Sequence, residues 1–141
     1  MSKHIFNLRL SASYTSSDNT IVTLDVQVLT EKGWEPLELD PMTPGFLIYV
    51  YSIFTCQHLF LRTNSTERDL VLAASQGEIR VEASEDWLLE KVDVSFNVYL
   101  ASGDPSDDRV DYIVSRMKQC PVSKNLPNNI DVHTGVEFHH G

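Results

Sequence analysis

Two cysteines are the residues best suited to chemistry in this sequence of 141 residues. Cys56 lies in an apolar stretch at positions 44–61, and Cys120 directly precedes Pro121. A cysteine acts as a nucleophile when its thiol ionises, whereas a thiol in apolar surroundings is usually inert. The apolar surroundings of Cys56 favour an inert thiol. For Cys120, a nucleophilic thiol and an inert one both stay open. The two residues are 64 positions apart, so sequence spacing does not decide whether they meet.

The histidines add no clear catalytic partner. His58 follows Cys56 by two positions, so on a helix it points to a different side, and we expect it to be a satisfied polar group near the core. His133, His139 and His140 lie near the end of the sequence without further ligands nearby, so we expect no metal site. The sequence also has no glycine-rich phosphate loop and no motif of a nucleophilic serine.

The elements that must position the cysteines begin with strands. Apolar residues that alternate with polar ones are typical of half-buried strands, and polar turns between two such runs indicate hairpins. The cleanest run has Val92, Val94, Phe96, Val98 and Leu100 on one face. Strands are predicted at 4–14, 22–28, 34–39, 78–83, 92–100 and 130–138.

A first helix is predicted from Phe46 to about Arg62, with Thr43 as its N-cap and Pro44 at its first position. Its residues are apolar nearly all round, which is typical of a helix surrounded by protein. Cys56 lies in its second half.

A second, amphipathic helix is predicted to start near Pro105, with Asp104 or Ser106 as its cap. The order hairpin, helix, hairpin, helix, strand predicts an α+β fold with mainly antiparallel strand pairing. We expect one domain over residues 1–141, since there is no linker, repeat or low-complexity segment.

Cys120 lies where this second helix should end. A residue before proline is pushed out of helical backbone angles, so the helix is predicted to stop at about Gln119. Pro121 can then begin a short helical turn that continues through Lys124, with Cys120 as its N-cap. Free backbone N–H groups at a helix start lower the pKa of a thiol, and Lys124 could add positive charge.

Composition excludes several classes of function. The formal net charge is −9, and no Lys/Arg cluster offsets it, so nucleic-acid binding is not expected. The N-terminal residues lack the apolar core of a signal peptide, which predicts a cytoplasmic protein with free thiols. Residues 44–61 approach the length of a membrane span, but Gln57 and His58 interrupt them, so a buried helix is favoured over a membrane helix.

The segment "RMKQCPVSKNLP", with the second helix before it, resembles the C-terminal signature of the OsmC-like superfamily, the osmotically induced and organic hydroperoxide resistance proteins. The stretch "TPGFLIYVYSIFTC" is similar to the buried central helix that carries the family's earlier cysteine. The resemblance covers essentially the whole chain, and its most specific part is "CPVSK". It implies antiparallel sheets packed around two central helices in an intertwined homodimer, with active sites near the subunit interface.

The resemblance also implies a thiol-dependent peroxidase. Cys56 would be the thiolate that attacks the peroxide and becomes a sulfenic acid, and Cys120 would be the resolving thiol that forms a disulfide. Thiols or a dithiol reductant would restore both, and no cofactor would be required. The organic hydroperoxide would lie against apolar walls that four residues could supply: Phe46, Tyr49, Ile53 and Phe54.

The sequence departs from the family pattern in two places. Peroxide-reducing members usually have a glutamate at the start of the central helix, where Gly45, Phe46 and Leu47 stand here, and an arginine near the first strands. Arg9 is the only arginine before Arg62. An acid from the preceding loop could substitute, the candidates being Glu35, Glu38 and Asp40.

We weigh three functions and favour the first. The first is a thiol peroxidase that uses Cys56 and Cys120. The second is a protein of the same fold without peroxidase activity, which binds a small apolar ligand between its central helices. The third is a structural dimer with two inert thiols. Close thiols and an arginine near Cys56 would favour the first.

Overall fold

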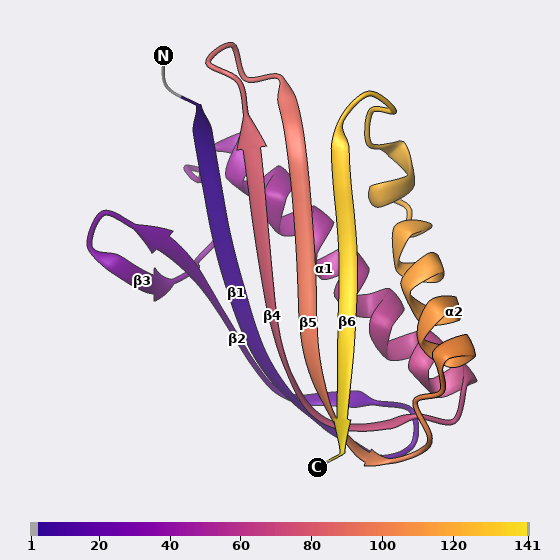
Figure 1. Ribbon diagram of the computed structural model, residues 1–141. Helices are drawn as coiled ribbons and strands as arrows, with labels where there is room; N and C mark the ends of the chain where they lie inside the picture. Colours follow the sequence, from indigo (N-terminus) through magenta and orange to yellow (C-terminus); the bar gives the residue numbers. More distant parts are fainter. Residues whose placement is uncertain (1–2, 141) are drawn as a thin grey trace.

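A computed structural model describes residues 3–140 and shows an α+β fold, in which two helices lie on one face of a six-stranded sheet (Figure 1). The elements in chain order are β1 His4–Thr15, β2 Thr20–Thr30, β3 Gly33–Pro36, α1 Gly45–Glu67, β4 Val71–Ala83, β5 Leu89–Ser102, α2 Asp107–Lys118, the 3₁₀ helix η1 Ser123–Asn125, and β6 Asp131–His140.

The sheet has the strand order β3-β2-β1-β4-β5-β6. Neighbouring strands pair antiparallel except β5 and β6, which are parallel because α2 crosses over between them. The predicted class and the mainly antiparallel pairing are confirmed. Within one chain there is one sheet, with both helices on a single side of it.

The core lies between the sheet and the two helices. Alternation along β1 and β5 turns the apolar residues toward the helices, as the period of two predicts. On α1 and α2 the buried side chains come at helical spacing, so each helix presents one stripe to the sheet. The largest fully buried side chains include Phe54, Phe96, Leu8, Leu61 and Met117.

The start of α1 differs from the prediction. Pro44 is the N-cap of α1 and not its first residue, and no side chain caps this end. Thr43 instead accepts a hydrogen bond from the backbone N–H of Asp40, at 2.9 Å, within the preceding turn. The helix also continues beyond Arg62 to Glu67, since the polar residues there still find partners along the helix.

Strand β4 begins at Val71, seven residues before its predicted start. The missed part contains small residues in place of a clear apolar alternation. Gly77 is required there because a Cβ at this position would collide with the ring of Phe96 on β5. The small side chain therefore reflects close packing, which hides the strand from a pattern based on apolarity.

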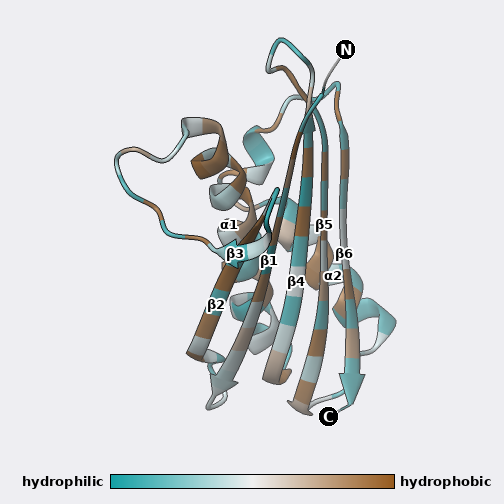
Figure 2. Ribbon diagram, turned by 90° about the vertical axis from the view of Figure 1, so that its left-hand side faces the viewer, coloured by the Kyte–Doolittle hydropathy of each residue, from teal (hydrophilic) through white to brown (hydrophobic). Residues whose placement is uncertain are grey.

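The apolar surface of α1 is only partly covered within the chain. The helix packs on β4 and β1 and against α2. Ile48 and Leu59 on its outer side are 40% and 44% exposed. On the same side of the sheet, Leu24 of β2 pairs with the buried Ala12 but is itself 47% exposed. The prediction that protein surrounds this helix is thus fulfilled on one side only. Figure 2 shows apolar residues on β2 and on α1 from this side.

No helix within residues 3–140 is both long enough and apolar enough to span a membrane.

Candidate thiol site

The fold brings the two cysteines together. Cys56 lies on α1 and Cys120 directly follows α2, and these helices pack against each other. The two thiols lie near enough for Cys120 to influence the pKa of Cys56. Cys120 is fully buried, while Cys56 is half-buried, and both are free thiols. The condition that a two-cysteine mechanism imposes on the fold is therefore met.

The turn after α2 is built differently from the prediction. The helix has its C-cap at Gln119, as expected, but the short helix η1 begins at Ser123 with Val122 as its N-cap. Cys120 precedes this cap, and its sulfur accepts a hydrogen bond from the backbone N–H of Ser123 at 3.4 Å. Its carbonyl accepts another from the N–H of Lys124 at 2.9 Å, while the Lys124 side chain is exposed. The Cys120 sulfur thus accepts a backbone hydrogen bond, although Cys120 is not the N-cap of η1.

The environment of Cys56 favours the protonated thiol. Burial, with a smaller contribution from the neighbouring Cys120 thiol, raises the pKa of Cys56 to about 11. The backbone N–H groups of Val122 and Ser123 lie on this side of the thiol and oppose the rise. Within the described residues, no cation contributes to this pKa. At neutral pH the single chain therefore holds Cys56 as a thiol.

Two arginines, Arg9 on β1 and Arg62 on α1, have partners away from the thiol pair. Arg9 points to the sheet face away from the helices, since its neighbour Leu8 is buried under them. There its Nε donates to Gln27 at 2.7 Å, and its guanidinium lies 4.3 Å from the centre of the Trp34 ring. Arg62 donates to the backbone oxygen of Asn19 at 3.4 Å. Neither contributes to the pKa of Cys56.

The acids proposed as substitutes have other partners. Glu35 accepts a hydrogen bond from Thr30 at 2.6 Å, and Asp40 accepts one from the backbone N–H of Met42 at 2.7 Å. Glu38 is exposed. Within residues 3–140, none of the three contributes to the pKa of Cys56.

The four predicted substrate residues fall into two groups. Ile53 and Phe54 have no exposed surface, so they offer none to a ligand in this conformation. Phe46 and Tyr49 are half-buried, and their rings lie 5.6 Å apart in an edge-on contact. Tyr49 precedes Cys56 by seven residues, which places both on the same side of α1, about 10 Å apart along its axis.

An aromatic cluster extends from Phe46. Its ring lies 5.2 Å from that of Phe6 and 5.3 Å from that of Trp87, which in turn stacks on His4 at 3.6 Å. Trp87 is 49% exposed and lies at the tip of the β4–β5 hairpin. Trp87 is not predicted from the sequence, because a single Trp in a polar turn carries no periodic signal.

His58 is a satisfied polar group in the core, as predicted. Its Nε2 lies 2.6 Å from the hydroxyl of Tyr14, which also contacts the hydroxyl of Ser75. All three residues are buried. Burial and, to a lesser extent, the charge of Arg62 lower the pKa of His58 to about 4. Burial likewise raises the pKa of Tyr14 to about 12. This cluster is separate from the thiols.

The neutral state of His58 predicts a pH-dependent stability. Its folded pKa lies below the unfolded value of about 6.5, so the unfolded chain binds the extra proton more readily. The contribution is complete above pH 6.5 and is lost as the pH falls toward 4, by about 3 kcal/mol at most. Urea unfolding at pH 7 and pH 4.5 measures this loss, and His58→Gln should reduce it. An equal loss in both proteins would contradict the assignment to His58.

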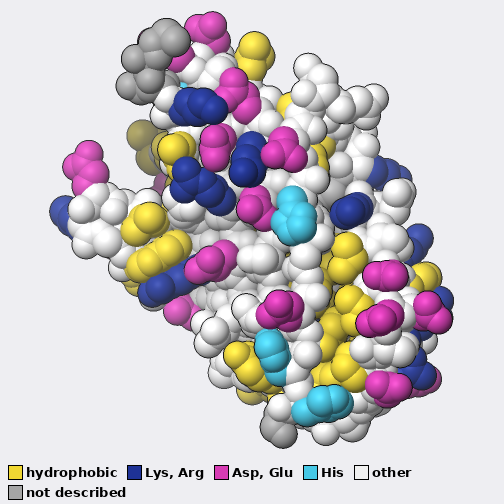
Figure 3. Space-filling model, viewed as in Figure 1, with side chains coloured by type: hydrophobic (Ala, Val, Ile, Leu, Met, Phe, Trp, Pro, Cys, Tyr) yellow, Lys and Arg dark blue, Asp and Glu magenta, His cyan; other side chains and the backbone are white. Residues whose placement is uncertain are grey.

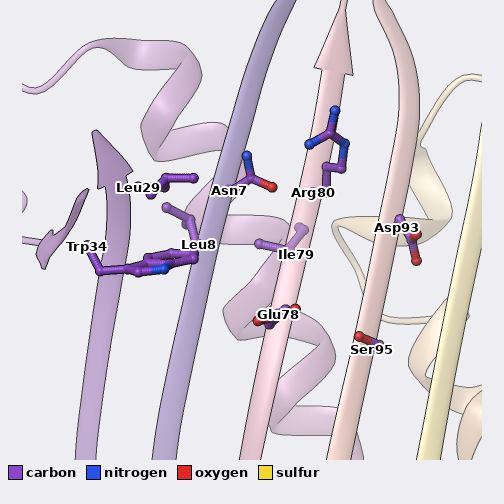
Figure 4. Close-up of a pocket in the computed structure, with 9 residues that line it drawn as sticks. All are labelled: Asn7, Leu8, Leu29, Trp34, Glu78, Ile79, Arg80, Asp93 and Ser95. Carbon is purple, nitrogen blue, oxygen red and sulfur yellow. The ribbon is translucent and has the colours of Figure 1, made fainter. Parts of the chain in front are cut away.

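The outer face of the sheet carries side chains of both charges (Figure 3). A shallow hollow of about 300 Å³ lies on this face, with Trp34, Asn7, Glu78, Arg80 and Asp93 among its lining residues (Figure 4). The strands β1, β4 and β5 supply most of them. Neither cysteine lines this hollow.

Comparison with solved structures identifies the architecture. An OsmC-like protein from Mycoplasma pneumoniae aligns over 99% of both chains with a TM-score of 0.57 and 10% identity. An OsmC-like hydroperoxide resistance protein from Jannaschia sp. aligns over 89% of this chain and 90% of its own, with a TM-score of 0.53 and 16% identity. An OsmC-like protein of unknown function from Vibrio cholerae aligns over 97% and 99%, with a TM-score of 0.52 and 9% identity.

No protein-family model and no curated protein matches the sequence. At these identities the structural similarity concerns the fold. The chain has the OsmC-like fold, as the "CPVSK" resemblance predicted.

Proposed function

We propose that this protein is a thiol-dependent peroxidase that reduces organic hydroperoxides with Cys56 and Cys120. The observation that carries the proposal is the contact between a half-buried thiol and a fully buried one. Cys56 is the thiol that a substrate can reach, so it attacks the peroxide. Cys120 lies behind it and resolves the product. A reducing compartment such as the cytoplasm would supply the thiol reductant.

The proposed reaction has two steps. The Cys56 sulfur attacks the terminal oxygen of the hydroperoxide, the O–O bond breaks, and the alkoxide takes up the proton that the thiol loses. The products are an alcohol and a sulfenic acid on Cys56. The Cys120 sulfur then attacks the Cys56 sulfur, an S–S bond forms, and the hydroxyl leaves with the Cys120 proton as water. Two reductant thiols restore both cysteines by disulfide exchange.

An organic peroxide suits the side of α1 that carries Cys56. Tyr49 lies on this side, and Phe46 and Trp87 continue the aromatic surface beyond it. An apolar substituent on the peroxide would cover these rings while its O–O group reaches the sulfur. Ile53 and Phe54 would support the surface from behind.

We further propose that the protein is a homodimer whose second copy completes this site. Ile48 and Leu59 are 11 positions apart, which is about three helical turns, so they form one exposed apolar stripe on α1. Cys56 lies about 60° around the helix from Leu59, at the border of the stripe. A partner that covers the stripe and Leu24 would also enclose Cys56 and could supply the missing cation.

The dimer predicts a specific effect of charge on this surface. Leu24→Glu or Leu59→Glu places a carboxylate where the partner would pack, and the dissociation constant should rise by at least about 100-fold. Analytical ultracentrifugation measures the change. The exposed outer-face residue Gln76 provides the matched control, since Gln76→Glu should leave the dimer intact. A wild-type protein that sediments as a monomer at micromolar concentration would contradict the proposal.

The raised pKa of Cys56 supports a second candidate, a binding protein that has the fold without the activity. Alkylation of Cys56 by iodoacetamide between pH 6 and 11 separates the two. If the assembled protein stabilises the thiolate, the rate should level off well below pH 11. A rate that still rises about tenfold per pH unit up to pH 10 would favour the binding protein, whose ligand would be small and apolar.

Titration of thiols in the reduced protein, with one equivalent of cumene hydroperoxide and intact-mass analysis, tests the peroxidase directly. Loss of both thiols together with a mass decrease of two hydrogens is expected. Two thiols that survive a large excess of peroxide would refute the proposal and leave a binding or structural role.

A further inference from the structure

A buried amide lies next to the thiol pair. Gln57 follows Cys56 on α1 and has no exposed surface. Its Nε2 donates to the hydroxyl of Ser123 at 3.0 Å, and its Oε1 accepts from the hydroxyl of Thr134 at 3.1 Å. One side chain therefore joins α1 to the turn after α2 and to strand β6. A glutamine in the middle of an apolar helix is costly to bury unless it has such partners.

The turn that holds Cys120 is ordered by its own hydrogen bonds. The N–H of Lys124 donates to the carbonyl of Cys120 at 2.9 Å, and the side chain of Asn125 donates to the carbonyl of Pro121 at 2.7 Å. The N–H of Ser123 donates to the Cys120 sulfur. Cys120 and Ser123 thus belong to one compact unit, so a force on Ser123 is transmitted to the thiol.

The attachment of this unit to α1 depends on few polar contacts. Within residues 3–140, the bond from Gln57 to Ser123 is the one side-chain hydrogen bond that joins the turn to α1. Gln57 and Cys56 are adjacent on α1, and Ser123 and Cys120 are close in the turn. The Gln57 amide therefore fixes the position of the turn along α1, at the level where the two sulfurs lie close together.

We propose that Gln57 is a positioning residue that holds the Cys120 sulfur against Cys56 and thereby sets the rate and equilibrium of disulfide formation. This inference rests on the proposed function only through the second step of the proposed reaction, the formation of the disulfide. In that step the Cys120 sulfur attacks the sulfenic acid of Cys56, an S–S bond forms, and water leaves. The first step, attack of Cys56 on the peroxide, needs no contribution from Gln57.

Gln57→Leu tests the role because it removes both hydrogen bonds at nearly the same volume. The first measurement equilibrates the intact protein with glutathione disulfide, in which two protein thiols and one glutathione disulfide give one protein disulfide and two glutathione thiols. We expect the effective concentration of the thiol pair to fall at least tenfold in Gln57→Leu. Gln76→Leu, the same change on the exposed outer face, should leave it within twofold.

The second measurement is the two-step reaction with cumene hydroperoxide. We expect the rate of Cys56 oxidation to stay within threefold, while closure of the disulfide slows tenfold or more, so that sulfenic acid accumulates. If Gln57→Leu does not fold, Ser123→Ala removes the same contact from the turn side and should give the same split. An unchanged effective concentration in a folded Gln57→Leu or Ser123→Ala protein overturns the positioning role.

The glutathione equilibrium needs no peroxide, so the two proposals fail separately. A wild-type protein that forms the disulfide with glutathione but ignores peroxide refutes the peroxidase and leaves the role of Gln57 open to the same comparison of variants. A wild-type protein that reacts with peroxide while Gln57→Leu closes its disulfide at the normal rate refutes the role of Gln57 alone.

Discussion

Replacement of Cys56 by serine should abolish the reaction with organic hydroperoxides, with a fall in rate of about 100-fold or more. A serine hydroxyl has no accessible anion near neutral pH and forms no product equivalent to a sulfenic acid. Cys56 is also the half-buried member of the pair, so no other described thiol can take its place at the surface. Stopped-flow consumption of cumene hydroperoxide by the reduced protein measures the effect.

The matched variant is at Cys120. Cys120→Ala should retain the first oxidation of Cys56 at a similar rate, but a sulfenic acid should persist where the wild-type protein forms a disulfide. A mass increase of one oxygen in this variant, against a loss of two hydrogens in the wild-type protein, distinguishes the products. If Cys56→Ser and Cys120→Ala lose the first step equally, the assignment of separate roles is wrong.

The sequence predicted the scaffold of this site better than its electrostatics. Strands β1 and β5 and the start of α2 near Pro105 follow from periodicity and capping alone, because these patterns are local. The predicted end of α2 at Gln119 follows from the proline two residues later. In contrast, the contact between Cys56 and Cys120 depends on how α1 and α2 pack, which no local pattern encodes.

The least predictable features are those that involve buried polar groups. The sequence marked Gln57 and His58 only as interruptions of an apolar run. Their partners come from distant elements, namely Ser123 and Thr134 for Gln57 and Tyr14 for His58. The N-cap role of Cys120 was also wrong, because the turn takes an additional residue pair before η1 begins at Ser123. Such side-chain networks exist only once the tertiary fold has assembled.

The fold connects its core to the thiol site through Phe96 on β5. The ring of Phe96 lies 5.6 Å from that of Phe54 and stacks on His58 at 5.7 Å with an angle of 12°. Phe96 is 1% exposed, and Gly77 beside it leaves the space that the ring occupies. It therefore packs against α1 within one turn of Cys56, and its loss should loosen the helix on the sheet.

We expect Phe96→Ala to lower the free energy of unfolding by about 3–5 kcal/mol, because a large cavity replaces a fully buried aromatic ring. That is about a fifth or more of the total for a chain whose stability is the usual ~5–15 kcal/mol. Urea denaturation at pH 7 measures the loss. Tyr99→Ala is the matched control on the same strand, since Tyr99 is 37% exposed and its ring stacks on the exposed side of the sheet with His139 at 5.1 Å. This control should cost less than about 1 kcal/mol.

If the two variants lose equal stability, the core does not depend on Phe96 as argued. If only Phe96→Ala loses stability, and the thiol pair also closes more slowly in its folded fraction, then packing at β5 helps to hold Cys56 in place.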